Sequence, residues 1–147
     1  MSLKERLLED MKIAMRDKDS VRKNTIQMAR SAVLQVEKDN KVALDDGGII
    51  EVIAKEAKKR KDSLPEFEKS GRQDLIDNLK TEIEVLMQYL PQQLTEEELE
   101  QIVKAAVQET GASSVRDMGK IMQAVMPKIK GRADGKQVNQ IVNKLLK

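Results

Sequence analysis

The side chains best placed to do chemistry are cations near the end of the chain. Lys128, Lys130, Arg132 and Lys136 fall where one predicted helix gives way to the next, and Lys120 lies about two turns earlier. Backbone amides at the start of the second helix would add donors for a phosphate, and nearby glycines let a ligand backbone come close. The chemistry that this cluster predicts is the binding of an anion.

A second interpretation of the same residues stays open. Lys128 and Lys130 could simply complement the dipole at the end of the preceding helix, with Asp134 and the glycines at 131 and 135 serving as ordinary helix caps. No aromatic residue separates these cations, so base stacking is excluded and a nucleic acid could be held only through its backbone and shape.

Charge along the chain favours the anion-binding interpretation. Residues 1–94 carry 18 basic and 18 acidic side chains, whereas residues 111–147 carry 8 basic and 2 acidic ones. The last 37 residues are therefore net +6 in a chain whose overall charge is only +2. Such an asymmetry indicates an anionic partner, although lysine-rich helical surfaces are also common.

Composition excludes most catalytic and metal sites. The chain has no Cys and no His, which rules out disulfides, thiolate nucleophiles, imidazole acid–base catalysis and the usual zinc ligand sets. Carboxylates at Glu82, Glu84 and 96–100 fit no calcium loop, and no complete phosphate-loop motif is present. We expect no catalytic residue, no metal site and no cofactor.

A second basic run occupies the middle of a predicted helix. Lys55, Lys58, Lys59, Arg60 and Lys61 form this run, but acidic residues surround it at spacings that allow local ion pairs. It predicts either a second binding patch or a solvated helix face.

Apolar residues recur at helical spacing throughout, so we predict an all-α fold. About four helices should form the first half, with a stripe in the second of them at Val21, Thr25, Met28, Ala29, Ala32, Val33 and Val36. Three more should follow, with an inward stripe in the sixth at Met118, Ile121, Met122, Val125 and Met126.

Turn signals divide these helices. Residues 39–48 predict a loop, Thr95 begins a capping box, Gly111 ends a helix, Ser113 or Ser114 caps the next, and residues 127–135 predict a connection. Pro65 predicts either a kink or a fresh helix start capped by Ser63. Pro91 marks the boundary between domains at 1–91 and 92–147.

The start of the chain mixes charges with Leu and has no apolar core typical of a signal peptide, and no stretch reaches the ~20 apolar residues of a membrane span. We therefore expect a cytoplasmic protein.

Fragments in both halves resemble the bacterial YqeY-like family of the GatB/YqeY domain group. The first half carries 59–63 (KRKDS), Phe67, 71–75 (GRQDL) and 89–91 (YLP); the second carries 111–114 (GASS), 118–120 (MGK), 126–135 (MPKIKGRADG) and 138–139 (VN). Their order and spacing together make the resemblance specific.

The resemblance implies a helical N-terminal domain and a three-helix C-terminal domain similar to the tail of the B subunit of tRNA-dependent amidotransferase. It implies that Lys120, Lys128, Lys130, Arg132 and Lys136 face RNA, with Asn139 as a polar contact. It also brings a family label, carbon–nitrogen ligase with glutamine as amido-N-donor, for which the residues supply no catalytic group.

We therefore expect a non-catalytic protein that binds tRNA or associates with tRNA amidotransferase through the helix junction at 128–136. The alternative is a protein–protein adaptor that docks a partner through the helices of residues 1–91, and ligase activity is a third.

Overall fold

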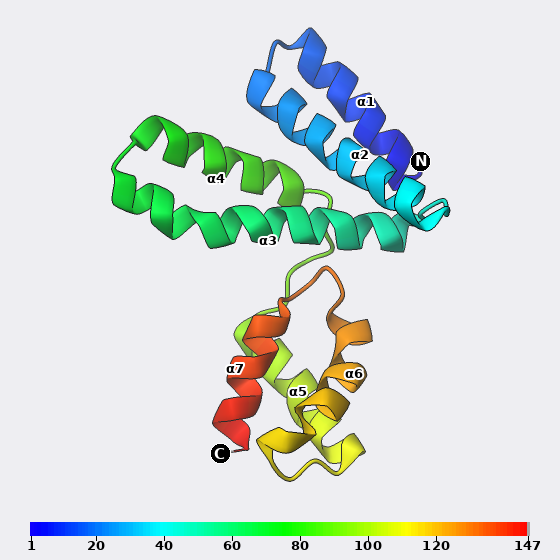
Figure 1. Ribbon diagram of the computed structural model, residues 1–147, viewed down its shortest axis with the longest axis vertical. Helices are drawn as coiled ribbons and strands as arrows, with labels where there is room; N and C mark the ends of the chain where they lie inside the picture. Colours follow the sequence, from blue (N-terminus) through cyan, green and yellow to red (C-terminus); the bar gives the residue numbers. More distant parts are fainter. Residues whose placement is uncertain (147) are drawn as a thin grey trace. The chain divides into compact units, whose positions relative to one another are not determined.

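The computed structural model of the chain describes residues 1–146, and all regular secondary structure within that range is helical (Figure 1). This confirms the all-α prediction. The helices of this range are α1 (Leu3–Arg16), α2 (Ser20–Asn40), α3 (Asp46–Ser70), α4 (Gln73–Met87), α5 (Glu96–Thr110), a short 3-10 helix η1 (Val115–Asp117), α6 (Met118–Ile129) and α7 (Gly135–Leu145).

The chain divides into a first unit, Met1–Leu90, and a second unit that begins at Pro91. The identification of residues 92–147 as a domain similar to the amidotransferase tail stays a prediction.

The first unit consists of two helical hairpins, α1 with α2 and α3 with α4 (Figure 1). Leu7, Ile26, Ile49, Ile53 and Leu86 are fully buried between them, although Ile26 lies outside the stripe predicted for the second helix. Burying one such side chain stabilises the fold by roughly 1.5–3 kcal/mol, so these contacts supply much of the stability of the first unit.

The predicted loop at 39–48 is too long at both ends. Helix α2 continues to Asn40, and α3 already begins at Asp46. Asp45 caps α3 by accepting from the Gly48 N–H, while Asp46 accepts from the Leu3 N–H at 2.9 Å. These residues therefore serve a helix start and a contact to α1, and the Gly47–Gly48 pair lies within the first turn.

Pro65 neither ends nor restarts a helix. Helix α3 runs unbroken from Asp46 to Ser70, and the Ser63 hydroxyl donates to the Lys59 carbonyl at 2.9 Å, so it caps nothing. The predicted fresh start is wrong because packing against α4 holds this segment helical in spite of the lost backbone donor.

Tyr89 closes the first unit by joining the end of the α3–α4 hairpin to α1. Its ring is 4% exposed, its hydroxyl donates to Asp10 Oδ2 at 2.5 Å, and the Arg6 guanidinium lies 4.7 Å from the ring centroid. Arg6 also approaches Asp10, with 3.8 Å between Nε and Oδ2. Burial, followed by the bond to Asp10, raises the pKa of Tyr89 well above its ordinary value of 10.0.

The second unit is a small three-helix arrangement around Val103, Ile121, Val125, Val138 and Val142, all fully buried. Three of its helix ends carry the caps that the sequence predicts. Thr95 and Glu98 form a capping box at α5, Gly111 ends α5 in the left-handed region at φ 67°, and Asp134 caps α7. The predicted serine cap of the sixth helix is wrong, because Ser114 caps the short η1 and α6 begins only after η1, at Met118.

Helix α6 extends further than predicted. Pro127 lies inside it and the helix ends at Ile129, whose side chain is fully buried and anchors the last turn. Met126 of α6 and Met28 of α2 were both predicted to point inward. Met126 is 45% exposed and Met28 is 51% exposed. Helical spacing places a side chain on a stripe, but the edge of that stripe remains in solvent.

Tyr89 supplies a pH test of the first unit. Since its folded-state pKa lies above that of the unfolded chain, the stabilising contribution of the protonated phenol is complete below pH 10 and is lost as the pH rises beyond that value. Tyr89 is the sole tyrosine of the chain, so phenolate absorbance reports it alone. We expect ionisation clearly above pH 10, together with loss of helical circular dichroism.

In the Asp10→Asn variant, Tyr89 should ionise at a lower pH than in the native protein, because no carboxylate at position 10 opposes the negative charge of the phenolate. Ionisation of native Tyr89 near its ordinary pKa, with the helices intact, would contradict this account of the contact.

Candidate functional site

The α6–α7 junction is shaped by a buried anchor, a glycine and a cap. Ile129 ends α6 inside the core, Gly131 turns the backbone at φ 73°, and Asp134 begins α7 by accepting from the Lys136 N–H at 3.1 Å. Gln137 completes a capping box through its side-chain oxygen, which accepts from the Asp134 N–H. The loop that carries the predicted cations is thus built from local signals.

Three of the predicted RNA-facing residues surround this junction with exposed side chains, namely Lys128, Lys130 and Lys136. Lys128 belongs to the last turn of α6, where its Nζ lies 3.8 Å from Glu109 Oε2 at the end of α5. Both partners of that pair are largely exposed, so water and salt screen it. Asn139 is exposed one turn after Lys136 on α7.

Lys120 is not gathered with the other cations along α6. It lies in the first turn of that helix, and the eight residues between it and Lys128 correspond to about 12 Å of axial rise. It acts electrostatically on Asp117, whose pKa is lowered first by the hydrogen bond from the Ser113 N–H and also by Lys120.

Arg132 has a structural contact that the sequence did not suggest. Its Nε donates to the Gln92 carbonyl at 3.1 Å, and its own carbonyl accepts from the Leu94 N–H at 3.0 Å. Gln93 adds a bond from its side-chain amide to the Gly131 carbonyl at 2.8 Å. The segment before α5 is therefore tied to the α6–α7 loop, and Arg132 is half-buried.

Residues 111–147 contain two acids, and both are engaged by backbone donors. Asp117 accepts from the Ser113 N–H at 3.0 Å, and Asp134 caps α7. Because backbone donors hold these two acids and Glu109 forms only an exposed, screened pair with Lys128, the cations dominate the electrostatics of the junction.

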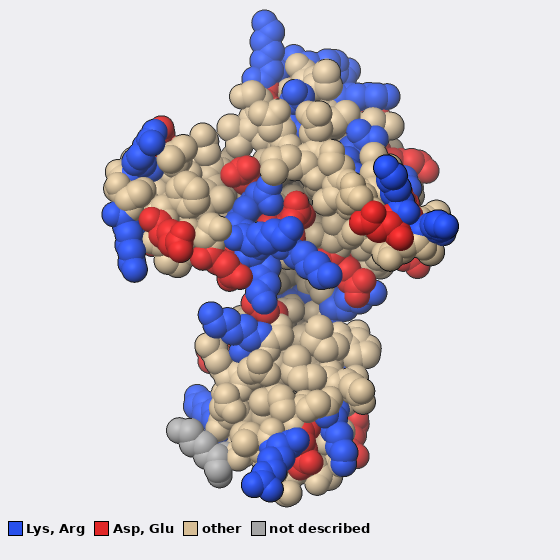
Figure 2. Space-filling model, viewed as in Figure 1, with Lys and Arg blue, Asp and Glu red and all other residues tan. Residues whose placement is uncertain are grey.

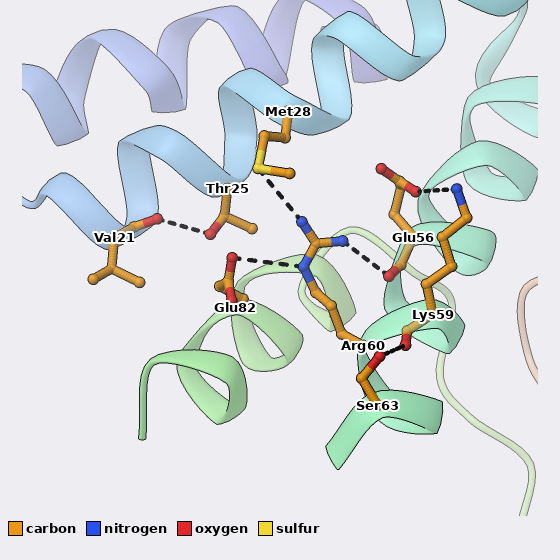
Figure 3. Close-up of polar contacts among 8 residues, drawn as sticks. All are labelled: Val21, Thr25, Met28, Glu56, Lys59, Arg60, Ser63 and Glu82. Atoms are coloured by element: carbon orange, nitrogen blue, oxygen red, sulfur yellow. Dashed lines mark hydrogen bonds and ion pairs between the residues drawn. The ribbon is translucent and has the colours of Figure 1, made fainter. Parts of the chain in front are cut away.

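The first unit holds a second polar site, centred on Arg60 of α3 (Figure 3). Its Nη1 donates to the Glu56 carbonyl at 3.0 Å, its Nη2 contacts Met28 Sδ on α2 at 3.7 Å, and its Nε lies 3.7 Å from Glu82 Oε1 on α4. The Arg60 side chain is only 11% exposed. One guanidinium thus contacts three helices.

The basic run of α3 is therefore not a uniform patch. In Figure 2, Lys and Arg side chains gather over α3 with acidic side chains beside them. Lys59 pairs with Glu56 at 3.1 Å, as the spacing predicted, whereas Arg60 points toward α2 and α4. Sequence spacing carried no signal that separated Arg60 from its neighbours.

A shallow groove lies beside Arg60 on the α2 side, with a volume of about 630 Å³. Its lining consists of Asn24, Gln27, Met28, Ser31, Ala32 and Glu56. These side chains offer amide, hydroxyl and carboxylate groups, which bind by hydrogen bonds, and no thiol or imidazole nucleophile. Among residues 1–146 no group of three or more acids forms a metal-ligand cluster, and no helix of that range could span a bilayer.

Comparison with known proteins decides the family. The model of the family described as Yqey-like protein matches residues 4–146. The chain belongs to the YqeY-like family. The resemblance seen in the sequence fragments is thereby confirmed.

Several relatives of this family member are fungal proteins. The protein of Pyrenophora tritici-repentis named "Altered inheritance of mitochondria protein 41, mitochondrial" is 31% identical over 144 residues, covering 96% of this chain and 79% of the relative. The protein of the same name from Kluyveromyces lactis is 40% identical over 84 residues, 56% of this chain and 45% of the relative. In that second match, the shared region is less than half of the relative's length.

These names contradict the expectation of a bacterial, cytoplasmic protein. That expectation rested on the lack of a secretory apolar segment and of a membrane span. Neither observation distinguishes one aqueous compartment from another, whereas the relatives from Pyrenophora and Kluyveromyces are both named as mitochondrial.

The Arg60 contacts predict a difference between two arginines of the first unit. Arg60→Ala removes a half-buried ion pair and the hydrogen bond to Glu56, so the free energy of unfolding should fall by about 2 kcal/mol. Arg72→Ala is the matched control, because its side chain is 65% exposed and should change stability by less than ~0.5 kcal/mol. Urea unfolding followed by circular dichroism measures the free energy of unfolding of both variants. If the two substitutions lowered it by the same small amount, the buried contacts of Arg60 would not stabilise the fold.

Proposed function

We propose that this YqeY-like protein binds structured RNA, with tRNA as the first candidate, through phosphate contacts at the α6–α7 junction. The observation that carries the proposal is the grouping of exposed Lys128, Lys130 and Lys136 around a loop whose one acid, Asp134, caps α7, while Glu109 forms only an exposed, screened pair with Lys128. Lysine ammonium groups bind phosphates as point charges, and the first-turn amides of α7 add donors beside them.

The contacts of Arg132 refine which residues should be tested. Because its Nε bonds to the Gln92 carbonyl, replacing it would disturb the segment before α5 as well as any RNA contact. The side chains of Lys128, Lys130 and Lys136 are exposed, so their substitution should disturb the fold less than substitution of the half-buried Arg132. Lys120 lies at the far end of α6 and would reach only an RNA long enough to follow that helix.

The tRNA identity rests on the family resemblance of the second unit to the amidotransferase tail. The fungal relatives are named as mitochondrial, so a mitochondrial tRNA is the natural probe beside bulk tRNA. The carbon–nitrogen ligase label finds no support in either site, because the chain has no thiol or imidazole that could serve as a nucleophile or base there.

Salt dependence provides the test. If about four phosphates are neutralised, log affinity should fall with log salt at a slope near −3 to −4 by counterion release. A triple variant with Lys128, Lys130 and Lys136 each changed to Glu should lose at least about tenfold in affinity and most of that slope. Fluorescence anisotropy of labelled tRNA measures both.

The matched control changes Lys12, Lys69 and Lys80 to Glu. These exposed lysines belong to the first unit, and the control alters net charge by the same amount. It should keep affinity within about threefold, the residual effect of long-range charge at moderate salt. Equal losses in both triple variants, or affinity that ignores salt, would refute the proposal.

A protein partner that docks through residues 1–91 is the alternative proposal. A partner retained by residues 1–91 of the full-length protein after nuclease treatment, together with salt-insensitive RNA binding, would favour it. The triple variant at Lys128, Lys130 and Lys136 separates RNA binding from docking of a protein partner, because these lysines lie outside residues 1–91.

A further inference from the structure

The turn between α1 and α2 is locally basic in a unit whose charges otherwise balance. Residues 12–23 carry five basic and two acidic side chains, whereas residues 1–94 as a whole carry 18 of each. The name α1–α2 tip is used here for Lys12, Met15, Arg16 and Lys18, whose side chains are all exposed. Figure 2 shows Lys and Arg side chains gathered over this end of the first unit. An exposed basic cluster attracts anions.

The three cations of the tip are not neutralised within the part of the chain that the structure describes. They form no ion pair and no side-chain hydrogen bond with any of residues 1–146. At the opposite end of α1, by contrast, Lys4 pairs with Glu37 at 2.7 Å. Of the two acids near the tip, Asp19 caps α2 by accepting from the Arg22 N–H at 3.2 Å, which leaves only Asp17 to offset the cations. The tip therefore keeps positive charge for an external partner.

Lys18 holds a backbone conformation that disfavours a lysine. Its φ is 57°, in the left-handed region that a glycine adopts without strain. Strain of this kind points to a role for the side chain. Lys41, at the end of α2, is the other left-handed residue besides glycine among residues 1–146. Residues 37–46 carry four acids and two cations, so Lys41 shares the strain of Lys18 without its basic surroundings.

Met15 indicates which anionic partner fits the tip. Its side chain is 55% exposed, and it lies one turn after Lys12 and directly before Arg16. The phosphates of an RNA would pair with the cations but would leave this apolar side chain in water. An anionic bilayer accommodates both, because its phosphates lie at the surface and its acyl boundary accepts an apolar side chain. Such a contact needs no membrane-spanning helix.

We infer that the α1–α2 tip binds the surface of an anionic lipid bilayer, with Lys12, Arg16 and Lys18 on the lipid phosphates and Met15 at the acyl boundary. The tip forms one end of the α1–α2 hairpin, so it presents the cations and the methionine together (Figure 1). The attraction of such a surface falls off within a Debye length, so binding depends on the cations of the tip and weakens as salt rises.

Flotation of nuclease-treated, RNA-free full-length protein with lipid vesicles tests the inference. The protein should bind vesicles of equal parts phosphatidylcholine and phosphatidylglycerol, here called mixed vesicles, and should not bind vesicles of phosphatidylcholine alone. Changing Lys12, Arg16 and Lys18 each to Glu should weaken binding to mixed vesicles at least about tenfold. The triple Glu variant of the α6–α7 junction is the matched control, because it alters net charge equally, and it should bind within about threefold of the native protein.

A fluorescent probe tests the role of Met15. The chain has no tryptophan, so Met15→Trp introduces a single indole. Mixed vesicles should shift its emission to shorter wavelength, because the indole enters the acyl boundary. Leu34→Trp is the matched control, since Leu34 has the same 55% exposure but lies in the second half of α2. Its emission should not change.

The two left-handed lysines supply a matched pair of single substitutions. Lys18→Gly and Lys41→Gly each remove one positive charge and the same kind of backbone strain. Lys18→Gly should weaken binding to mixed vesicles at least about threefold, and Lys41→Gly should not weaken it. A native protein that does not bind mixed vesicles, equal losses in the two triple variants, an unshifted Met15→Trp emission, or equal effects of the two glycine variants would each overturn the inference.

Discussion

The Arg60 guanidinium is the constraint around which the first unit is organised. A cation that is only 11% exposed must keep its hydrogen bonds and its counter-charge, and Arg60 finds them on three helices at once. Glu82 fixes α4 against α3, the Met28 sulfur brings in α2, and the Glu56 carbonyl supplies the remaining partner.

Tyr89 plays a corresponding part at the other end of the same unit. Its hydroxyl reaches Asp10 across 79 positions of sequence, and Arg6 covers its ring. In a chain with one Tyr, one Phe and no Trp, aliphatic side chains supply the bulk of both cores. Polar contacts such as those of Tyr89 and Arg60 then specify which helices meet, because Leu, Ile and Val pack with little directional preference.

The second unit separates its structural charges from its exposed ones. Its caps use Thr95, Glu98 and Asp134, and Glu96 and Glu97 also lie in the first turn of α5, where the helix dipole favours acids. Lys128 and Lys144 lie in the last turns of α6 and α7, which the dipole also favours, whereas Lys120 and Lys136 lie in first turns. Helix chemistry thus accounts for the acidic start of α5 and for part of the basic junction, and the proposed RNA surface uses the lysines that are exposed there.

Local signals in the sequence determined the helices, the capping box at Thr95, the left-handed end at Gly111 and the cap at Asp134, because each depends on residues within one helical turn. The family followed from the order of short motifs. Tertiary packing decided that α3 and α6 continue through Pro65 and Pro127, that Arg60 turns inward from a basic run, and that Arg132 bonds to Gln92. It also decided that Met28 lies at the surface. These outcomes depend on which helix lies opposite each residue, and contacts between residues far apart in the chain set that arrangement.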